Sequence, residues 1–161
     1  MAFFTDDTDY SGPPITGDMV RSAEAAVGFR LPRAYLELLH ERNGGIPIRC
    51  CFPTAARTSW AEDHIKISGL MGIGNEQGID GELGSAYLIQ EWGYPNIGIV
   101  ICDTLSGGHD TIMLDYSACG VDGEPGVVDI DDDRSILPLA ATFADFVAGL
   151  VKFDERLPEP P

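Results

Sequence analysis

The chain has 161 residues and a formal net charge of −16, because it carries 26 acidic residues against 10 Lys and Arg. Binding to nucleic-acid phosphates or to anionic lipid is therefore not expected, since both need clustered Lys and Arg. The hydrophobic share of 44% suits one globular domain with its own core, and no stretch approaches the roughly 20 apolar residues of a membrane span.

The acidic residues are concentrated in the middle of the chain. Between Lys66 and Arg134 there is no Lys or Arg, whereas 13 of the 26 acidic residues lie there, with His109 as the one potential cation. A surface of one sign repels anions and attracts a basic partner. Acidic surfaces also serve solubility alone, so composition by itself leaves both interpretations open.

The first 15 residues are polar and acidic and end in Gly12-Pro13-Pro14, which predicts a loosely ordered lead-in over 1–15. Acidic residues near the start have the wrong charge for a signal peptide. The cysteines, at positions 50, 51, 102 and 119, form no C-x-x-C pair, which favours buried, reduced thiols. We therefore expect a cytoplasmic protein whose folded domain spans 16–152, followed by a Pro-rich tail over 153–161.

Two helices are predicted after the lead-in. Thr16 can cap a helix over 17–27, and Gly28 provides its stop. Pro32 marks the start of a second helix, in which apolar residues recur at helical spacing. The residues on this apolar face are Leu31, Tyr35, Leu38 and Leu39. Asn43-Gly44-Gly45 ends the helix.

From residue 46 the pattern changes to short strands, which are predicted over 46–52 and 65–73. Five glycines and three acids over 72–84 predict an exposed loop rather than a packed element. A helix follows over 85–92 and is ended by Gly93. The side chains predicted to face inward from this helix are Tyr87, Leu88 and Trp92.

The second half of the chain predicts a hairpin and a closing helix. Residues 98–102 are apolar at consecutive positions, which is typical of a central strand covered on both faces. The chain turns through Gly107-Gly108, and 111–115 returns as the hairpin partner. A short strand over 127–130 precedes a helix capped by Thr142, whose apolar face contains Phe143, Phe146, Val147 and Leu150. Together these elements predict an α+β fold with a single, mostly antiparallel sheet packed with helices.

The order of these motifs resembles that of the SMI1/KNR4, or SUKH, superfamily, over nearly the whole chain from residue 16 to 151. The residues that carry the resemblance are Leu31, Pro32, Tyr35, Asn43, Gly44, Gly45, Gly108, Phe143 and Phe146. Two features depart from the usual pattern. His109 stands in the hairpin turn where Asn or Asp is more usual, and the loop 72–84 is long. Both lie where partner specificity can vary.

The resemblance implies a binding protein rather than an enzyme. Many bacterial members of the superfamily are similar to immunity proteins, which neutralise a toxin domain, often a nuclease. A nuclease that grips phosphates has a basic cleft, and an acidic protein can occlude it. The predicted partner is therefore a basic toxin domain, and the predicted contacts are Glu76, Asp80, Glu82, Asp103, Asp110 and Asp115. Each can instead be a solvated carboxylate, and Asp103 and Asp115 can hold turns through side-chain hydrogen bonds.

The alternatives are a scaffold or regulatory interaction module of the SMI1/KNR4 type and, as a minor one, a metal-dependent hydrolase. No G-x-S-x-G motif is present, and the glycines from Gly72 do not match a dinucleotide-binding loop. The acids of 129–133 offer hard oxygen ligands but lack the Gly and closing Glu of an EF-hand, which favours a charged, solvated turn. His109-Asp110 near Asp103 is the other candidate cluster. No cofactor and no metal site are predicted.

Overall fold

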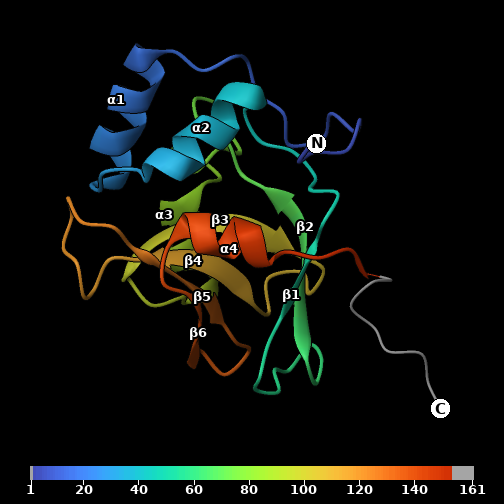
Figure 1. Ribbon diagram of the computed structural model, residues 1–161. Coiled ribbons are helices and arrows are strands. Elements are labelled where there is room, and N and C mark those ends of the chain that lie inside the picture. Colours follow the sequence, from blue (N-terminus) through green and yellow to red (C-terminus); the bar gives the residue numbers. More distant parts are fainter. Residues whose placement is uncertain (1, 154–161) are drawn as a thin grey trace.

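The computed structural model describes residues 2–153, which form four helices and a six-stranded antiparallel sheet (Figure 1). The helices are α1 (Gly17–Val27), α2 (Arg33–Glu41), α3 (Ser85–Trp92) and α4 (Phe143–Gly149). The strands are β1 (Cys51–Pro53), β2 (His64–Leu70), β3 (Gly98–Thr104), β4 (Thr111–Asp115), β5 (Gly126–Ile130) and β6 (Ile136–Ala140). The predicted α+β class is confirmed. The predicted Pro-rich tail lies outside the described residues from position 154 onward.

The sheet is a meander in which each strand pairs antiparallel with the next, in the order β1 to β6. After α4 the chain returns to the first strand, where Val151 and Cys51 exchange two backbone hydrogen bonds. From the β1–β2 loop, the backbone N–H of Ser59 reaches the carboxylate of Asp131, just beyond β5, at 3.1 Å. The sheet is therefore curled and nearly closed.

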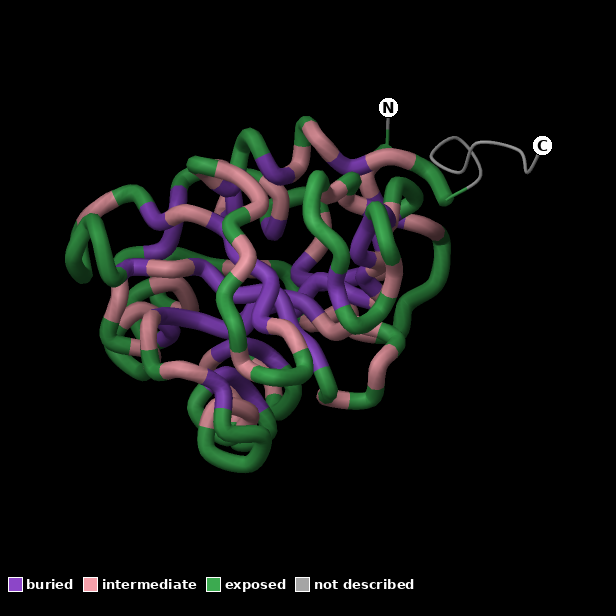
Figure 2. The backbone as a smooth tube through the Cα atoms, turned by 90° about the horizontal axis from the view of Figure 1, so that it is seen from below, coloured by how far each residue is buried: buried purple, intermediate pink, exposed green. Residues whose placement is uncertain are grey.

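The core lies between the sheet and the helices α2 and α4. Residues 99–102 of β3 are fully buried, as predicted for a central strand, and Figure 2 shows buried segments (purple) gathered in the middle of the molecule with exposed segments (green) around them. The ring of Phe143 packs edge-on against Tyr35, with ring centroids 5.3 Å apart. The Tyr35 hydroxyl donates to the carbonyl of Met71 at 2.5 Å. These aromatic residues therefore join two helices to the β2–β3 connection.

Side-chain caps and glycines bound the helices where the sequence predicts them. The Thr16 hydroxyl accepts the N–H of Met19 at 3.2 Å, and the Thr142 hydroxyl accepts the N–H of Asp145 at 3.1 Å. Gly28 ends α1 in the left-handed conformation, with φ of 81°. The four predicted helices are confirmed.

The first predicted strand is shifted, because the N-terminal segment occupies its backbone. β1 covers 51–53 rather than 46–52. The N–H of Thr5 bonds to the Ile46 carbonyl at 2.8 Å, and the N–H of Ile48 bonds to the Phe3 carbonyl at 2.9 Å. Phe4 is buried in the core. Residues 3–5 of the predicted lead-in are thus packed against the domain, whereas residues 6–9 are exposed.

The loop 72–84 is exposed only in part, which corrects the prediction of a loop without packed residues. Ile73 and Ile79 are buried, and the N–H of Ile79 bonds to the Gly72 carbonyl at 2.8 Å. A Cβ at Gly81 would lie 2.1 Å from the carbonyl oxygen of Asn75, so this backbone approach requires glycine. The glycines that predict an open loop instead permit a compact one.

Three further expectations differ from the structure. The sequence pattern does not predict β6, because Pro138 interrupts it and its side chains are at most half-buried, as suits an edge strand. Tyr87 and Trp92 are 42% and 38% exposed rather than inward-facing. Cys119 is exposed rather than buried.

Within residues 2–153, none of the helices has the length and apolar character that crossing a bilayer requires.

Candidate functional site

The meander brings three loops to one end of the sheet: 54–63, 105–110 and 131–135, here called the loop end. Two of the predicted contacts, Asp103 and Asp110, lie at this end. The other four lie at the opposite end, because β3 and β4 pair Gly98 with Asp115 there and the β2–β3 connection returns to the same place. The structure therefore divides the six predicted contact residues between two ends.

At the opposite end, the acids have different surroundings. Glu76 and Glu82 are exposed. The carboxylate of Asp80 accepts the N–H of Gly74 at 2.9 Å. Asp115 accepts both the N–H of Ser117 at 2.9 Å and its hydroxyl at 2.6 Å. Asp115 thus forms the turn that the sequence left as an alternative, whereas partner contact by Glu76 and Glu82 remains a proposal.

A buried carboxyl pair lies at the loop end. Asp110 is 4% exposed and accepts the Thr104 hydroxyl at 2.7 Å. Asp129 of β5 is 0% exposed, and neither of its oxygens has a hydrogen-bond partner. Burial, together with the charge and hydrogen bonding of Asp110, raises the pKa of Asp129 to about 8. A proton held by Asp129 supplies the missing hydrogen bond to Asp110. Asp110 is therefore a buried residue of the turn rather than an exposed carboxylate.

Beside this pair is a cavity of about 260 Å³. The residues that line it include the acids Asp103 and Asp110 and the aromatic residues Tyr10, Trp92 and Tyr94. Burial raises the pKa of Asp103, although its hydrogen bond with Tyr10 acts in the opposite direction. Tyr10 reaches this place from the N-terminal segment, so residues distant in sequence enclose the cavity.

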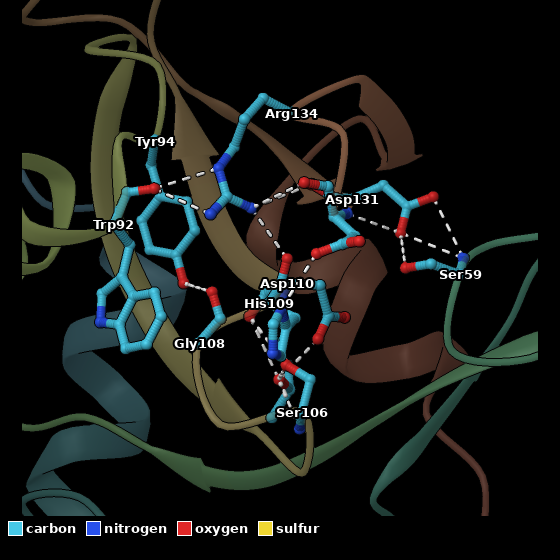
Figure 3. A network of polar contacts seen from close by, with 11 residues as sticks. Ser59, Trp92, Tyr94, Ser106, Gly108, His109, Asp110, Asp131 and Arg134 are labelled. Carbon is cyan, nitrogen blue, oxygen red and sulfur yellow. Dashed lines mark hydrogen bonds and ion pairs between the residues drawn. The ribbon is translucent and has the colours of Figure 1, made fainter.

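Arg134 contacts the chain segments on which the cavity-lining residues Trp92 and Tyr94 lie (Figure 3). Its guanidinium donates to the carbonyls of Trp92 and His109, each at 2.8 Å, and lies 4.8 Å from the centroid of the Tyr94 ring. The Tyr94 hydroxyl donates to the carbonyl of Gly108 at 2.6 Å. Sequence reasoning missed these roles, because Arg134 and Trp92 are 42 positions apart and no local motif marks either.

The acids of 129–133 do not converge on one point. Asp129 lies beside Asp110, whereas Asp131 bonds to Ser59, Asp132 to His109 and Asp133 to Ser135. In the part of the chain that the structure describes, no group of three or more His, Cys, Asp or Glu is placed to hold a metal ion. The run therefore forms turn and loop contacts, and it offers the hydrolase alternative no ligand set.

Gly108 should tolerate no larger residue. Its φ is 101°, and a Cβ there would lie 2.5 Å from the Trp92 ring. We expect Gly108→Ala to lower the free energy of unfolding by about 2–3 kcal/mol, through backbone strain and displacement of the indole. Gly107→Ala is the matched control, because its φ is 70° and nothing lies within 4 Å of its Cβ position. The free energy of unfolding of Gly107→Ala should fall by only about 1 kcal/mol. Equal losses in denaturant unfolding would contradict the Trp92 contact.

A comparison with protein-family models decides the identity of the fold. The model of the SMI1/KNR4 family (SUKH-1) matches residues 14–149. The chain belongs to the SMI1/KNR4 family. The resemblance predicted from the motifs is thus confirmed, and SMI1/KNR4 domains are generally binding domains rather than enzymes. No curated protein and no solved structure matches the chain significantly.

The SMI1/KNR4 motif residues serve mainly the fold. Leu31, Tyr35, Phe143 and Phe146 are buried in the core, and Pro32 occupies the cap position of α2. Asn43, Gly44 and Gly45 contact the N-terminal segment and the chain after β2. Among the described motif residues, Gly108 is the one that lines the cavity. The motif therefore identifies the SMI1/KNR4 scaffold, whereas residues outside it form most of the candidate site.

Proposed function

We propose that this protein is an immunity protein of the SUKH type, which binds one cognate toxin domain stoichiometrically and neutralises it in the cytoplasm. The proposed toxin is basic and of the nuclease type. Membership in a family whose domains are commonly immunity proteins supports the proposal. The observation that carries it is the one-signed charge of the stretch between Lys66 and Arg134.

The loop end is the better candidate for the contact surface. Glu91, which precedes Trp92 at the end of α3, and Asp132, in the 131–135 loop, are exposed near this end. The guanidinium of Arg134 is turned toward backbone carbonyls and a ring, and Asp131 to Asp133 directly precede it in the chain. The negative charge of such a surface attracts a basic cleft over a distance, and it is complementary to the charge of that cleft in the complex.

The proposed function is tested with the product of the adjacent gene. The tagged full chain is used to capture that product, and its toxicity is scored in cells with and without this protein. We expect a one-to-one complex and rescue of growth. A product that neither binds nor loses toxicity would contradict the immunity role and leave the scaffold or regulatory module as the better account.

Charge reversal locates the surface. Glu91→Lys with Asp132→Lys alters the loop end, and Glu76→Lys with Glu82→Lys makes the same change of net charge at the opposite end. We expect the first pair to slow association with the basic partner about tenfold and the second pair by less than about threefold, with a stronger effect at low salt. Stopped-flow association measures both.

Neither pair should change the free energy of unfolding by more than about 0.5 kcal/mol, because the four carboxylates are exposed. A larger effect from the second pair would move the contact to the opposite end. Association that responds equally to both pairs would mean that only the net charge matters.

A further inference from the structure

The cavity at the loop end combines two features that favour a cation. Its lining includes two acidic residues, Asp103 and Asp110, and three aromatic ones, Tyr10, Trp92 and Tyr94. Among the described residues that line it, none is a Lys, Arg or His. A planar cation can stack on the rings and bond to the carboxylates at once, whereas a phosphate or a carboxylate ligand would be repelled.

A second observation concerns the carboxyl groups at and behind the cavity wall. Both oxygens of Asp129 are buried without a partner, and the side chain lies against Asp110, which lines the cavity. Arg134, whose guanidinium lies over the ring of Tyr94, is not part of the lining, and its donors are directed to backbone carbonyls. Among the described residues, none of the ion pairs includes Asp103, Asp110 or Asp129.

We infer that the cavity at the loop end receives an arginine side chain from the partner, with its guanidinium held between Asp103 and Asp110 and its plane against Trp92. This inference rests on the proposed function for the identity of the partner, although the binding of a guanidinium group by the cavity can be measured without it. Arginine fits better than lysine, because its planar group stacks on rings and donates to two carboxylates in fixed directions.

The two tryptophans provide the measurement. The sequence contains only Trp60 and Trp92; Trp92 lines the cavity, and Trp60 lies in the 54–63 loop outside its lining. The ¹⁵N-labelled full chain is titrated with N-acetyl-arginine methylamide, and N-acetyl-citrulline methylamide serves as the uncharged probe of the same shape. We expect a saturable shift of the Trp92 indole signal with the arginine probe, and little shift of Trp60 or with citrulline.

Variants assign the effect to the carboxyl groups. Asp103→Asn should weaken binding of the arginine probe at least about fivefold, because it removes a charge while keeping the shape. Asp115→Asn, at the opposite end, is the matched control and should leave binding unchanged. Asp110 also accepts the Thr104 hydroxyl, so Asp110→Asn can disturb the fold. This variant is therefore titrated only after its NMR spectrum shows a folded chain.

The outcomes separate this inference from the proposed function. Equal shifts with arginine and citrulline, or no Trp92 shift, would overturn the inference even if a toxin complex forms. A toxin complex whose affinity is the same with Asp103→Asn would also overturn it. An arginine-specific shift in a protein that binds no adjacent gene product would contradict the proposed function and leave guanidinium binding by the cavity established.

Discussion

The free energy of unfolding should fall as the pH rises from about 5 to about 9, and Asp129 should be the main cause. The side chain is fully buried, and burial first and Asp110 second raise its pKa to about 8. In the unfolded chain the pKa of an aspartic acid is about 3.9. The folded state therefore keeps a proton that the unfolded state releases. This contribution to stability is complete below about pH 4 and is lost as the pH rises through about 8.

Asp129→Asn tests this expectation, because an amide has nearly the same shape and can donate to Asp110 without a titrating proton. The linkage allows a loss of at most about 1.4 kcal/mol per pH unit in the wild type. We expect the variant to be about 2–4 kcal/mol more stable than the wild type at pH 9 and similar to it near pH 5. Urea unfolding at fixed pH values measures the difference.

The neighbouring titratable groups, Asp110, Asp131 and His109, are present in both proteins, so the difference between the two stability curves isolates Asp129. Asp115→Asn is the matched control, since its carboxylate is partly exposed and bonded to Ser117. Parallel curves for the wild type and Asp129→Asn would mean that Asp129 is ionised in the folded state throughout this range.

Asn43→Ala should destabilise the domain by about 3 kcal/mol. The side chain is 2% exposed and makes three hydrogen bonds of 2.8 Å. Its amide donates to the carbonyls of Pro13 and Ile73, and its oxygen accepts the N–H of Ile73. Alanine would leave the N–H and C=O groups of Ile73 without this partner in a buried place, where each unsatisfied group costs about 1–3 kcal/mol.

Asn96→Ala is the control for Asn43, because Asn96 is exposed, and it should change the free energy of unfolding by less than about 0.5 kcal/mol. Denaturant unfolding followed by far-UV circular dichroism compares the two. Hydrogen exchange adds a local readout: the amide of Ile73 should lose protection in Asn43→Ala. A loss of stability below about 1 kcal/mol, with Ile73 still protected, would show that water or a shifted backbone replaces the side chain.

Much of the fold could be predicted from local patterns. Helical spacing and the capping residues Thr16 and Thr142 locate two helices, and the apolar run 98–102 locates the central strand. The expectations that the structure corrects concern backbone pairing between segments that are distant in the sequence. Residues 46–48 pair with the N-terminal segment instead of forming a strand, and the glycine-rich loop 72–84 folds back on itself. Neither partner is local, so no window of the sequence carries the signal.

The candidate site was less predictable than the fold. Asp103 and Asp110 were predicted as exposed contacts, and they instead line a cavity, with Asp110 nearly buried. Trp92 was predicted to face the core, and Tyr94 and Arg134 had no assigned role. Their arrangement depends on hydrogen bonds to backbone carbonyls, which any residue can offer and no sequence pattern marks.

The sequence by itself determined the family, the antiparallel α+β architecture and the one-signed charge, because motif order, periodicity and charge are properties of the linear chain. The tertiary structure decided which acids share a surface. Antiparallel pairing of successive strands places Asp103 and Asp110 at one end and Glu76, Glu82 and Asp115 at the other. Burial also made a proton-holding pair of Asp110 and Asp129, because the energy of a carboxylate depends on the solvent and charges around it rather than on its neighbours in sequence.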